Sequence, residues 1–496
     1  MSKKYILAID QGTTGTRAIL LNQEGEIIAI FYREFTQYFP RAGWVEHDPE
    51  EIWQVTLQVV QGVLSEAKVS GTDIAAIGIT NQRETTILWE KDSGRPVYRA
   101  IVWQCRRTAP LCNKLKADGL QETVKHKTGL IIDPYFSATK IKWILDNIPK
   151  VREKAKRGKV LFGTVDSWLV WKLTGGRAHL TDYTNASRTM LFNIHSLKWD
   201  QELMDILDIP RQVLPQVRPS RYIYGYTKGS EVLPSGIPIA GILGDQQAAL
   251  FGQACFYPGT VKNTYGTGCF LLLNTGEEAV NSSKGLLTSI CCNEKGDPVY
   301  MLEGSVFVAG AAIQWLRDTL GLISTPEETE SLAGKVKDTG GVYMIPAFAG
   351  LGAPYWDPSA RGAILGITRG TRKEHLVRAT LESIAYQTKD VLEVMLQEAG
   401  VSIKEIRVDG GAAKNDWLMQ FQADILNLPV ARPLYIETTS LGAGFLAGLG
   451  IGYWKEKEIL HLWKREAVFL PRIRKETREK LYGGWKKAVS CILTSS

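Results

Sequence analysis

The sequence lacks the features of membrane-spanning, disulfide-stabilised and zinc-binding proteins. No uncharged run approaches the ~18 residues that a bilayer span requires, and the first residues show no signal-peptide pattern. The seven cysteines include no CxxC pair, which argues against a disulfide framework or a zinc site. We therefore expect a cytoplasmic protein without a membrane span.

Signatures of several kinds of nucleotide and metal chemistry are also missing. The chain has no GxxxxGK[ST], which excludes a Walker-type phosphate loop, and no GxGxxG after a predicted strand, which counts against NAD. It has neither HExxH nor a Cys/His cluster. The net charge is +7, but the basic residues are scattered and are not interleaved with aromatic ones, so we expect no nucleic-acid partner.

The opening of the chain contains a polar turn between two apolar runs. Residues 5–9 and 18–21 are rich in β-formers, and this order predicts a hairpin of buried strands. The turn between them holds glycines and threonines: Gly12, Thr13, Thr14, Gly15 and Thr16. Glycine lets backbone amides point at an anion, and Asp10 at the strand end could hold Mg²⁺ through a water molecule. We interpret the hairpin as a triphosphate cradle, with an ordinary Gly/Thr turn as the alternative.

A second stretch of this kind follows in the other half of the chain. Residues 259–273 predict a strand, a Gly/Thr turn and a second strand. A chain of 496 residues is long enough for two large domains, and the repeated hairpin places the break near residue 254. We therefore predict domains of residues 1–254 and 255–496.

Three polar segments follow predicted strands: residues 10–16, 82–84 and 103–104. In open α/β sheets ligands bind at strand ends, so we expect these segments to lie together. Asp245 also follows a strand, at the start of a helix predicted for residues 246–253. Taken alone, the Arg-Glu pair of the second segment could be an exposed ion pair, and Asp245 could be a helix N-cap.

Other helices are marked by their end residues or by their composition. Asp48 is a good N-cap, and Glu51 would complete a capping box with it. His47, just before this helix, is interpreted as a loop residue. Residues 416–426 predict a further helix, and the small residues of 438–450 predict one that packs closely on its neighbours.

Two long stretches, each with particular residues at fixed spacing, indicate a known protein family. Residues 135–147 and 362–382 match its two signatures, and the opening Ile-Asp-Gln-Gly-Thr-Thr matches the first phosphate motif of its superfamily. The sequence thus resembles the FGGY carbohydrate kinases, within the actin, heat-shock chaperone and hexokinase ATPase superfamily, over essentially its whole length. The resemblance implies an α/β fold of two actin-like (ribonuclease H-like) ATPase domains, with mixed sheets flanked by helices and a cleft between them.

The polar residues near Arg83, Asp245 and Thr264 match those of family members that phosphorylate glycerol. The resemblance implies transfer of the γ-phosphoryl of ATP to a terminal hydroxyl of glycerol, giving sn-glycerol 3-phosphate, with Asp245 as the catalytic base. The implied substrate-binding residues are Arg83, Glu84, Trp103, Tyr135, Asp245, Gln246 and Phe270. The implied ATP-binding residues are Thr13, Thr14, Arg17, Thr267, Gly310, Gln314, Gly411 and Asn415, and those near Mg²⁺ are Asp10 and Asp245.

On this basis the predicted first domain carries the polyol site and the first phosphate hairpin, and the second carries the other hairpin and the adenosine site. Arginine can donate to hydroxyl oxygens and glutamate can accept from hydroxyl hydrogens, while Trp103 and Phe270 would lie against the carbon chain. The family is usually dimeric or larger, so we expect a homodimer or a higher homo-oligomer.

Two alternatives remain open at this stage. The protein could be an FGGY kinase for another polyol or a ketose, or a non-enzymatic actin-like ATPase that switches or polymerises. Some family members are regulated by fructose 1,6-bisphosphate or by phosphorylation of a histidine. In those members the bisphosphate acts through a Gly/Arg loop near residues 230–236, and the phosphorylated histidine lies near residues 221–226. Here the first stretch has no arginine and the second has no histidine, so we expect neither form of regulation.

Overall fold

Two mixed sheets form the framework of the computed structural model, which describes residues 4–348, 350–357 and 359–494. The first sheet has the strand order β13 (Gly225–Tyr226), β14 (Pro238–Gly244), β5 (Ile74–Asn81), β1 (Tyr5–Gln11), β2 (Gly15–Leu21) and β3 (Ile27–Glu34). Strands β1 and β2 pair antiparallel with Asp10 opposite Arg17, which confirms the predicted hairpin. Strands β1, β5 and β14 are parallel, so their carboxyl ends share one edge.

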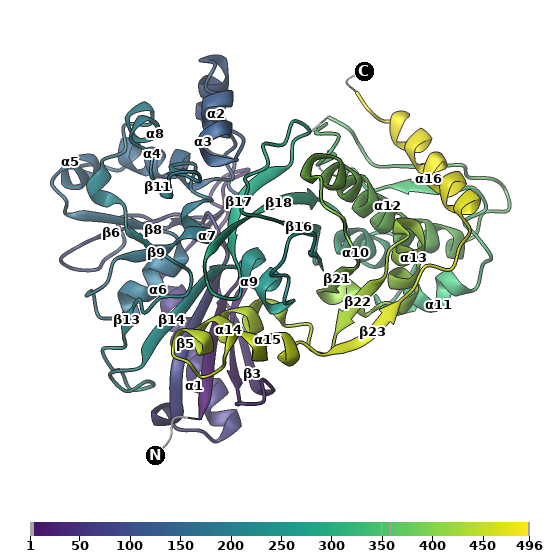
Figure 1. Ribbon diagram of the computed structural model, residues 1–496. Coiled ribbons are helices and arrows are strands. Elements are labelled where there is room, and N and C mark those ends of the chain that lie inside the picture. The colour runs from purple at the N-terminus through teal and green to yellow at the C-terminus, as the bar shows by residue number, and fades with distance from the viewer. Residues whose placement is uncertain (1–3, 349, 358, 495–496) are drawn as a thin grey trace.

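The second sheet repeats this plan. Its strand order is β17 (Leu287–Cys292), β18 (Pro298–Val306), β16 (Cys269–Gly276), β15 (Val261–Tyr265), β21 (Ile406–Asp409), β22 (Val430–Pro433) and β23 (Arg465–Phe469). Strands β15 and β16 form the second predicted hairpin, and β15, β21 and β22 are parallel. The part of the molecule built on the first sheet is named the first lobe below, and the part built on this sheet the second lobe (Figure 1).

Helix α1 (Pro49–Ala67) covers one face of the first sheet with buried apolar residues. Asp48 caps it by accepting from the Glu50 amide, but the predicted capping box is wrong. Glu51 Oε1 instead accepts from the amide and the hydroxyl of Thr36, at 2.9 and 2.8 Å, because the chain before the helix folds back over it. The loop prediction for His47 is also wrong, since this residue is fully buried in strand β4 (Glu46–His47).

The rest of the first lobe consists of helices and two-stranded ladders beyond the sheet. The helices are α2 (Ala109–Ala117), α3 (Gln121–Thr128), α4 (Ser137–Asn147), α5 (Val151–Lys156), α6 (Val165–Leu173), α7 (Tyr183–Ala186) and α8 (Gln201–Ile206). The ladders pair β4 with β7 (Ala100–Ile101), β6 (Ile87–Glu90) with β8 (Val160–Gly163), β9 (Leu180–Asp182) with β12 (Gln216–Arg218), and β10 (Phe192–Asn193) with β11 (Lys198–Trp199).

Helices α9 (Asp245–Gly252) and α14 (Thr438–Gly450) pack against each other at very short range, as the small residues of α14 predicted. A Cβ atom on Gly442 would lie 1.9 Å from the Ala248 carbonyl oxygen, so only glycine fits there. Helix α14 also packs on β5, β14 and β1. A segment late in the chain thus lies against the first sheet, although the predicted division at residue 254 assigns it to the second domain; that boundary stays a prediction.

The second lobe has the long helix α12 (Lys373–Ala399) at its centre, ended by Gly400 at φ 62°. Around it lie α10 (Gly310–Asp318), α11 (Glu328–Gly334), α13 (Asp416–Leu426), α16 (Lys475–Ser490) and the ladder of β19 (Tyr343–Ile345) with β20 (Ala363–Leu365). Helix α15 (Glu456–Leu462) follows α14. Among the described helices, none is long and apolar enough to cross a membrane.

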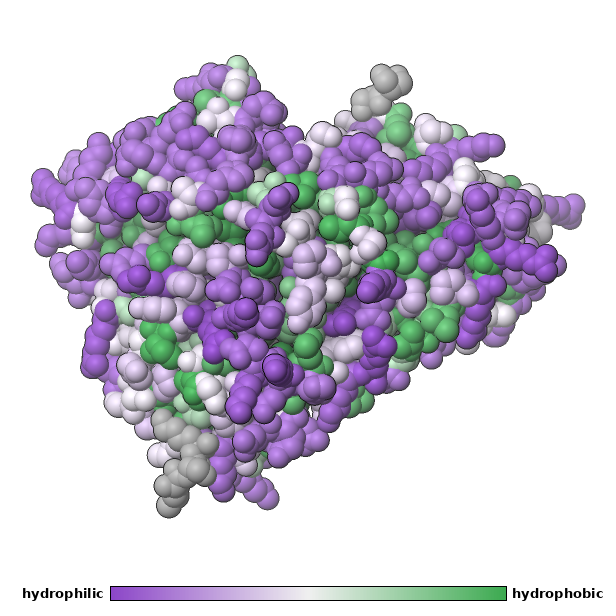
Figure 2. All heavy atoms as spheres, viewed as in Figure 1, coloured by the Kyte–Doolittle hydropathy of each residue, from purple (hydrophilic) through white to green (hydrophobic). Residues whose placement is uncertain are grey.

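The face shown in Figure 2 is mostly hydrophilic, with scattered apolar residues. Its upper edge is notched between the lobe that carries α2 and α3 and the lobe that carries α12 and α16 (Figures 1 and 2). The chain therefore forms two bodies joined along their lower part, and ion pairs described below cross that junction.

Candidate active site

The three polar segments that follow strands in the first lobe meet, as predicted. Gln82 Nε2 donates to Gln11 Oε1 at 3.1 Å, and Trp103 Nε1 donates to Thr13 Oγ1 at 2.9 Å. The parallel register of β1 and β5 explains the first contact, because their carboxyl ends lie side by side. The side chains near Arg83 therefore emerge beside the first hairpin turn.

Arg83 is buried, with 2% of its surface exposed, at the centre of a cluster of charges. Its Nη1 lies 2.7 Å from Glu303 Oε2 and its Nη2 lies 3.3 Å from Glu303 Oε1, which is a bidentate pair. Its Nε lies 3.1 Å from Asp245 Oδ1. The alternative of an exposed Arg83–Glu84 ion pair is wrong, because both residues are buried and their closest charged atoms are 3.8 Å apart.

Glu84 has the positive φ of 62°, which is uncommon for a residue with a side chain and marks a constrained position. Its Oε1 accepts from Arg188 Nε at 2.6 Å, and Arg188 Nη2 also donates to Glu303 at 3.0 Å. Burial raises the pKa of Glu84, whereas the two arginines oppose that shift. For Glu303 the arginines prevail over burial and lower its pKa to about 2. Two arginines and two glutamates therefore form a compact, charge-balanced group.

Asp245 is the first residue of α9, and Gly244 is the N-cap, so the N-cap alternative for Asp245 is wrong. Its Oδ1 accepts from the Gln246 amide at 2.7 Å, and 31% of its side chain is exposed. Burial raises its pKa, while Arg83 counteracts the rise. Asp245 thus keeps an accessible carboxylate beside the buried arginine.

Lys262, on β15 of the second lobe, is fully buried and reaches the residue after Asp245. Its Nζ donates to Gln246 Oε1 and, at 2.8 Å, to Thr264 Oγ1. Burial lowers its pKa to about 8, and the nearby Asp409, Asp245 and Glu303 limit the fall. Gln246 is therefore held in place by a cation from the other lobe.

The sequence prediction missed three charged residues of this cluster: Arg188, Lys262 and Glu303. Arg188 is 104 residues from Glu84, and Glu303 is 220 residues from Arg83. Arg188 and Glu303 lie outside the motifs that the sequence shows, and Lys262 lies in the predicted second hairpin. A charged residue gives no sign in the sequence that it will be buried beside a particular partner.

Two of the three predicted aromatic residues, Trp103 and Tyr135, contact each other, and Phe270 lies apart from them on the second lobe. The Trp103 and Tyr135 rings are in edge contact, with centroids 5.4 Å apart, and the Arg188 guanidinium lies 5.3 Å from the Tyr135 ring centre. Phe270 is half-buried on β16, the strand next to β18, which carries Glu303. The first two rings therefore adjoin the charged cluster, whereas Phe270 lies on the other lobe and packs against a small apolar group that includes Leu250 and Leu272.

Three of the predicted nucleotide-binding residues lie in the first hairpin. The Thr13 carbonyl accepts from Gln37 Nε2 at 3.0 Å, and Thr14 is exposed. The Arg17 guanidinium is half-buried 5.8 Å from the Tyr32 ring centre. The exposed hydroxyl and the guanidinium on this turn are groups that bind phosphate oxygens.

The second hairpin turn forms backbone hydrogen bonds with the start of α10. The Ala309 amide donates to the Thr267 carbonyl at 2.9 Å, and the Gly310 amide donates to the Gly266 carbonyl at 3.0 Å. A Cβ on Gly310 would lie 2.5 Å from the Gly266 oxygen, so the close approach requires glycine. Thr267 remains exposed, and Gln314 is exposed one turn further along α10.

Backbone also comes close to this turn from the end of β21. Gly410, at φ 88°, has no room for a Cβ, which would lie 2.4 Å from the Tyr265 carbonyl oxygen. Gly411 begins the short helix η3 (Gly411–Lys414) and faces open space. Asn415 caps α13 through Oδ1 and donates to Thr329 Oγ1 at 3.0 Å, so its amide group already has structural partners.

Asp10 and Asp245 are near enough for each charge to affect the other. Asp10 Oδ2 accepts from Ser440 Oγ of α14 at 2.8 Å. Burial raises the pKa of Asp10, Arg17 and Ser440 counteract the rise, and the charge of Asp245 adds to it. The described residues contain no group of three or more His, Cys, Asp or Glu side chains that could hold a metal alone. Two carboxylates without a full ligand set suit Mg²⁺, which is usually bound through one or two carboxylates, waters and substrate phosphates.

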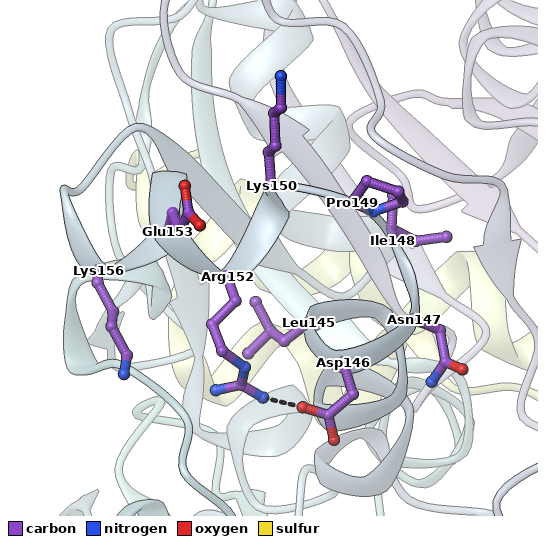
Figure 3. Close-up of a pocket in the computed structure, with 9 residues that line it drawn as sticks. All are labelled: Leu145, Asp146, Asn147, Ile148, Pro149, Lys150, Arg152, Glu153 and Lys156. Carbon is purple, nitrogen blue, oxygen red and sulfur yellow. Dashed lines mark hydrogen bonds and ion pairs between the residues drawn. The ribbon is translucent and has the colours of Figure 1, made fainter.

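A surface pocket of about 360 Å³ lies apart from these residues, between the end of α4 and helix α5 (Figure 3). Arg152 in this pocket pairs with Asp146 and Asp208, so its charge is already balanced. None of the predicted site residues lines it.

Comparison with known proteins identifies the class of protein to which this fold and site belong, a carbohydrate kinase of two domains. The pattern of the N-terminal domain of the FGGY family of carbohydrate kinases matches residues 5–252, and that of the C-terminal domain matches residues 261–451. The chain therefore belongs to the FGGY family of carbohydrate kinases, as its sequence predicted.

Several relatives match over almost the whole chain. The sequence is 61% identical to glycerol kinase 2 of Thermotoga maritima over 488 residues, which cover 98% of each chain. It is 59% identical to the glycerol kinase of Carboxydothermus hydrogenoformans over 491 residues, 99% and 98% of the two chains. The crystal structure of Plasmodium falciparum glycerol kinase with ADP matches with a TM-score of 0.94 and 39% identity, covering 100% of this chain and 99% of that one. These matches confirm the predicted two-domain α/β fold.

Proposed function

We propose that the protein is a glycerol kinase, which transfers the γ-phosphoryl group of ATP to a terminal hydroxyl of glycerol and forms sn-glycerol 3-phosphate. The observation that carries this proposal is the cluster of Arg83, Glu84 and Asp245 beside the Trp103–Tyr135 pair, at the carboxyl ends of parallel strands. Relatives named glycerol kinase, about 60% identical over nearly the full chain, support it.

The cluster offers the complementary groups that a small polyol needs. Arg83 Nε is a buried donor that makes no hydrogen bond in the described structure, because its close approach to Asp245 is poorly aligned. Such a donor is costly to leave without an aligned acceptor, and we propose that it donates to a hydroxyl oxygen of glycerol when the substrate binds. Glu84 uses Oε1 for Arg188, which leaves Oε2 to accept from a hydroxyl. The edges of Trp103 and Tyr135, and Phe270 from the other lobe, would contact the carbon chain.

Asp245 would act as the general base. It would accept the proton of the terminal hydroxyl as the oxygen attacks the γ-phosphorus, and burial places its pKa above the usual range. A positioned base of this kind typically contributes ~10²–10⁴-fold to the rate. Gln246, held by Lys262, would bind a further hydroxyl and fix the orientation of the alcohol.

The two hairpin turns would bind ATP from opposite lobes. Thr13, Thr14 and Arg17 of the first turn would hold phosphates, with Thr267 and Gly310 of the second. Gly411, Gln314 and Asn415 would lie on the adenosine side. Mg²⁺ bound with ATP neutralises phosphate charge, and Asp10 and Asp245 are the residues that would hold it. Closure of the lobes would exclude water, which otherwise competes as the phosphoryl acceptor.

A coupled assay for ADP tests the proposal and its alternatives. With ATP and Mg²⁺ we expect rapid turnover with glycerol and much lower kcat/KM with xylitol, xylulose and gluconate. Faster turnover with one of these longer substrates would instead identify another carbohydrate kinase. ADP release that no polyol stimulates would indicate an ATPase that does not phosphorylate a sugar alcohol.

Two further parts of the proposal concern where and in what form the enzyme works. A cytoplasmic location suits an ATP-dependent reaction and seven cysteines that are all free thiols, six of them buried. A homodimer or higher homo-oligomer is proposed from the family alone; sedimentation of the purified protein would measure it.

A further inference from the structure

A second cavity of the first lobe, of about 550 Å³, opens beside the β9–β12 ladder. None of the predicted site residues lines it. Its walls come from the end of α6, from β9 and β12, and from the segment that leads into β13. Its volume is within the ~300–1,000 Å³ of cavities that bind small organic molecules.

The charged residues that line this cavity are all basic. Lys91, Arg177 and Arg218 contribute to the wall, and no aspartate or glutamate does. Of the residues that the structure describes, none forms an ion pair with any of these three cations. Elsewhere in this lobe a basic side chain such as Arg152 has its own carboxylate partners. The cavity therefore concentrates uncompensated positive charge.

Arg218 shows the clearest sign of a missing partner. Its Nη2 donates to Gln216 Oε1 at 3.0 Å, and its guanidinium lies 5.3 Å from the Tyr222 ring centre. Its Nε is buried and has no hydrogen-bond partner. A buried charged donor without a hydrogen-bond partner is unfavourable, and an anion beside this guanidinium in the cavity would offset its charge.

The remaining walls are neutral and partly aromatic. Trp171 and Tyr222 present rings to the cavity. His179 also lines it, but burial lowers its pKa to about 4, so the ring is uncharged at neutral pH. Asp166 and Asp182 do not line the cavity, and their buried carboxyl groups accept hydrogen bonds from Thr181 and Ser220. An anionic group with an organic body matches this combination of cations and rings.

We propose that this cavity binds a phosphate monoester of a small molecule, with the phosphate against Arg177 and Arg218 and the organic body against Trp171 and Tyr222. Arginine binds phosphate through paired N–H groups, and aromatic rings provide contact area for the body. A free phosphate ion would fill only a small part of the volume. The inference is independent of the proposed reaction, because the two sites share no residue.

Isothermal titration calorimetry with phenyl phosphate tests this inference on the full chain. Saturating Mg²⁺, ADP and glycerol are included to occupy the candidate active site. We expect one saturable site, with affinity well above that for inorganic phosphate and no measurable binding of phenol. Absence of saturable binding would overturn the inference, and equal affinity for phenyl phosphate and inorganic phosphate would overturn the role of the organic body.

Three substitutions localise the binding. Arg218→Ala and Arg177→Ala should each weaken phenyl phosphate binding by about tenfold or more, because each removes charged donors. Arg369→Ala, at an exposed arginine of the second lobe, should leave it unchanged. Arg177 is exposed, so its substitution tests the site even if Arg218→Ala impairs folding. Unchanged affinity in the Arg177 variant, or equal losses in all three, would contradict the assignment.

Discussion

Arg83 of the first lobe and Glu303 of the second form a buried bidentate pair across the junction of the lobes, with Nη1 and Oε2 2.7 Å apart. Arg188 binds the same carboxylate, so one glutamate separates two guanidinium groups that would otherwise repel each other. Strand β18 thereby fixes the position of the arginine that we propose binds the substrate. The proposed polyol site therefore includes a residue from the other lobe.

Substitution Glu303→Gln tests this positioning role. The amide keeps the shape but cannot neutralise two arginines, and breaking a buried ion pair typically costs ~3–5 kcal/mol of stability. We expect the KM for glycerol to rise about tenfold or more, with a much smaller change in the KM for ATP. Steady-state kinetics and thermal unfolding measure both effects. Glu330→Gln, at an exposed position, is the matched control. A destabilised variant with an unchanged KM for glycerol would show that Glu303 is structural only.

Asp245→Asn removes the proposed base while the side chain keeps its size. Because proton acceptance is lost, we expect kcat to fall by ~10²-fold or more. The nucleotide affinity, measured by titration with ADP, should remain within a few-fold of the original value. The neighbouring Gln247→Glu is no suitable control, because Gln247 itself binds Arg83. Near-native turnover in the Asn variant would rule out the base assignment.

The burial of His47 predicts a pH dependence of stability. Burial lowers its pKa from 6.5 to about 4, so the folded protein binds this proton less readily than the unfolded chain does. Above pH ~6.5 this group does not lower the free energy of unfolding. As the pH falls toward 4 the free energy of unfolding decreases by up to about 3 kcal/mol, because the unfolded chain takes up the proton first. Urea unfolding of the wild type and His47→Gln between pH 7.5 and 4.5 measures it. The variant should lose less stability over this range; parallel curves would exclude His47 as a source.

Local signals in the sequence predicted the elements that depend on local chemistry. The bounds of α13 and α14 are the predicted residues 416–426 and 438–450, because the Asn415 cap and apolar periodicity mark the first helix and a run of small residues marks the second. Both hairpins and the meeting of Gln82 with Gln11 also followed from strand and turn patterns. The resemblance to the family supplied the roles of individual site residues, which the geometry alone would leave open.

The incorrect predictions concern partners that only the folded chain brings together. Glu51 matched a capping box, but Thr36 competes for its carboxylate after the preceding loop folds back. His47 was predicted in a loop, yet it is buried in strand β4, and the alternative of an exposed Arg83–Glu84 pair fails because tertiary contacts bury both residues. Arg188 and Glu303 could not be found, since their partners are far away along the chain and no spacing encodes a buried ion pair. Lys262 was missed because nothing in the strand sequence shows that its charge is buried beside Gln246.

The contact between α9 and α14 predicts an asymmetry between two glycine substitutions. A Cβ on Gly442 would lie 1.9 Å from the Ala248 carbonyl oxygen, so Gly442→Ala must push the helices apart. Overpacking of this kind typically costs ~1–3 kcal/mol. Gly483→Ala, in α16 with nothing within 4 Å of the new Cβ, should instead be neutral or stabilising by up to ~1 kcal/mol, because alanine favours helix. Urea unfolding compares the two variants.

The same contact also affects the candidate active site. Since α9 begins with Asp245 and α14 carries Ser440, which binds Asp10, Gly442→Ala should also lower kcat. Equal stability of the two variants would contradict the close contact.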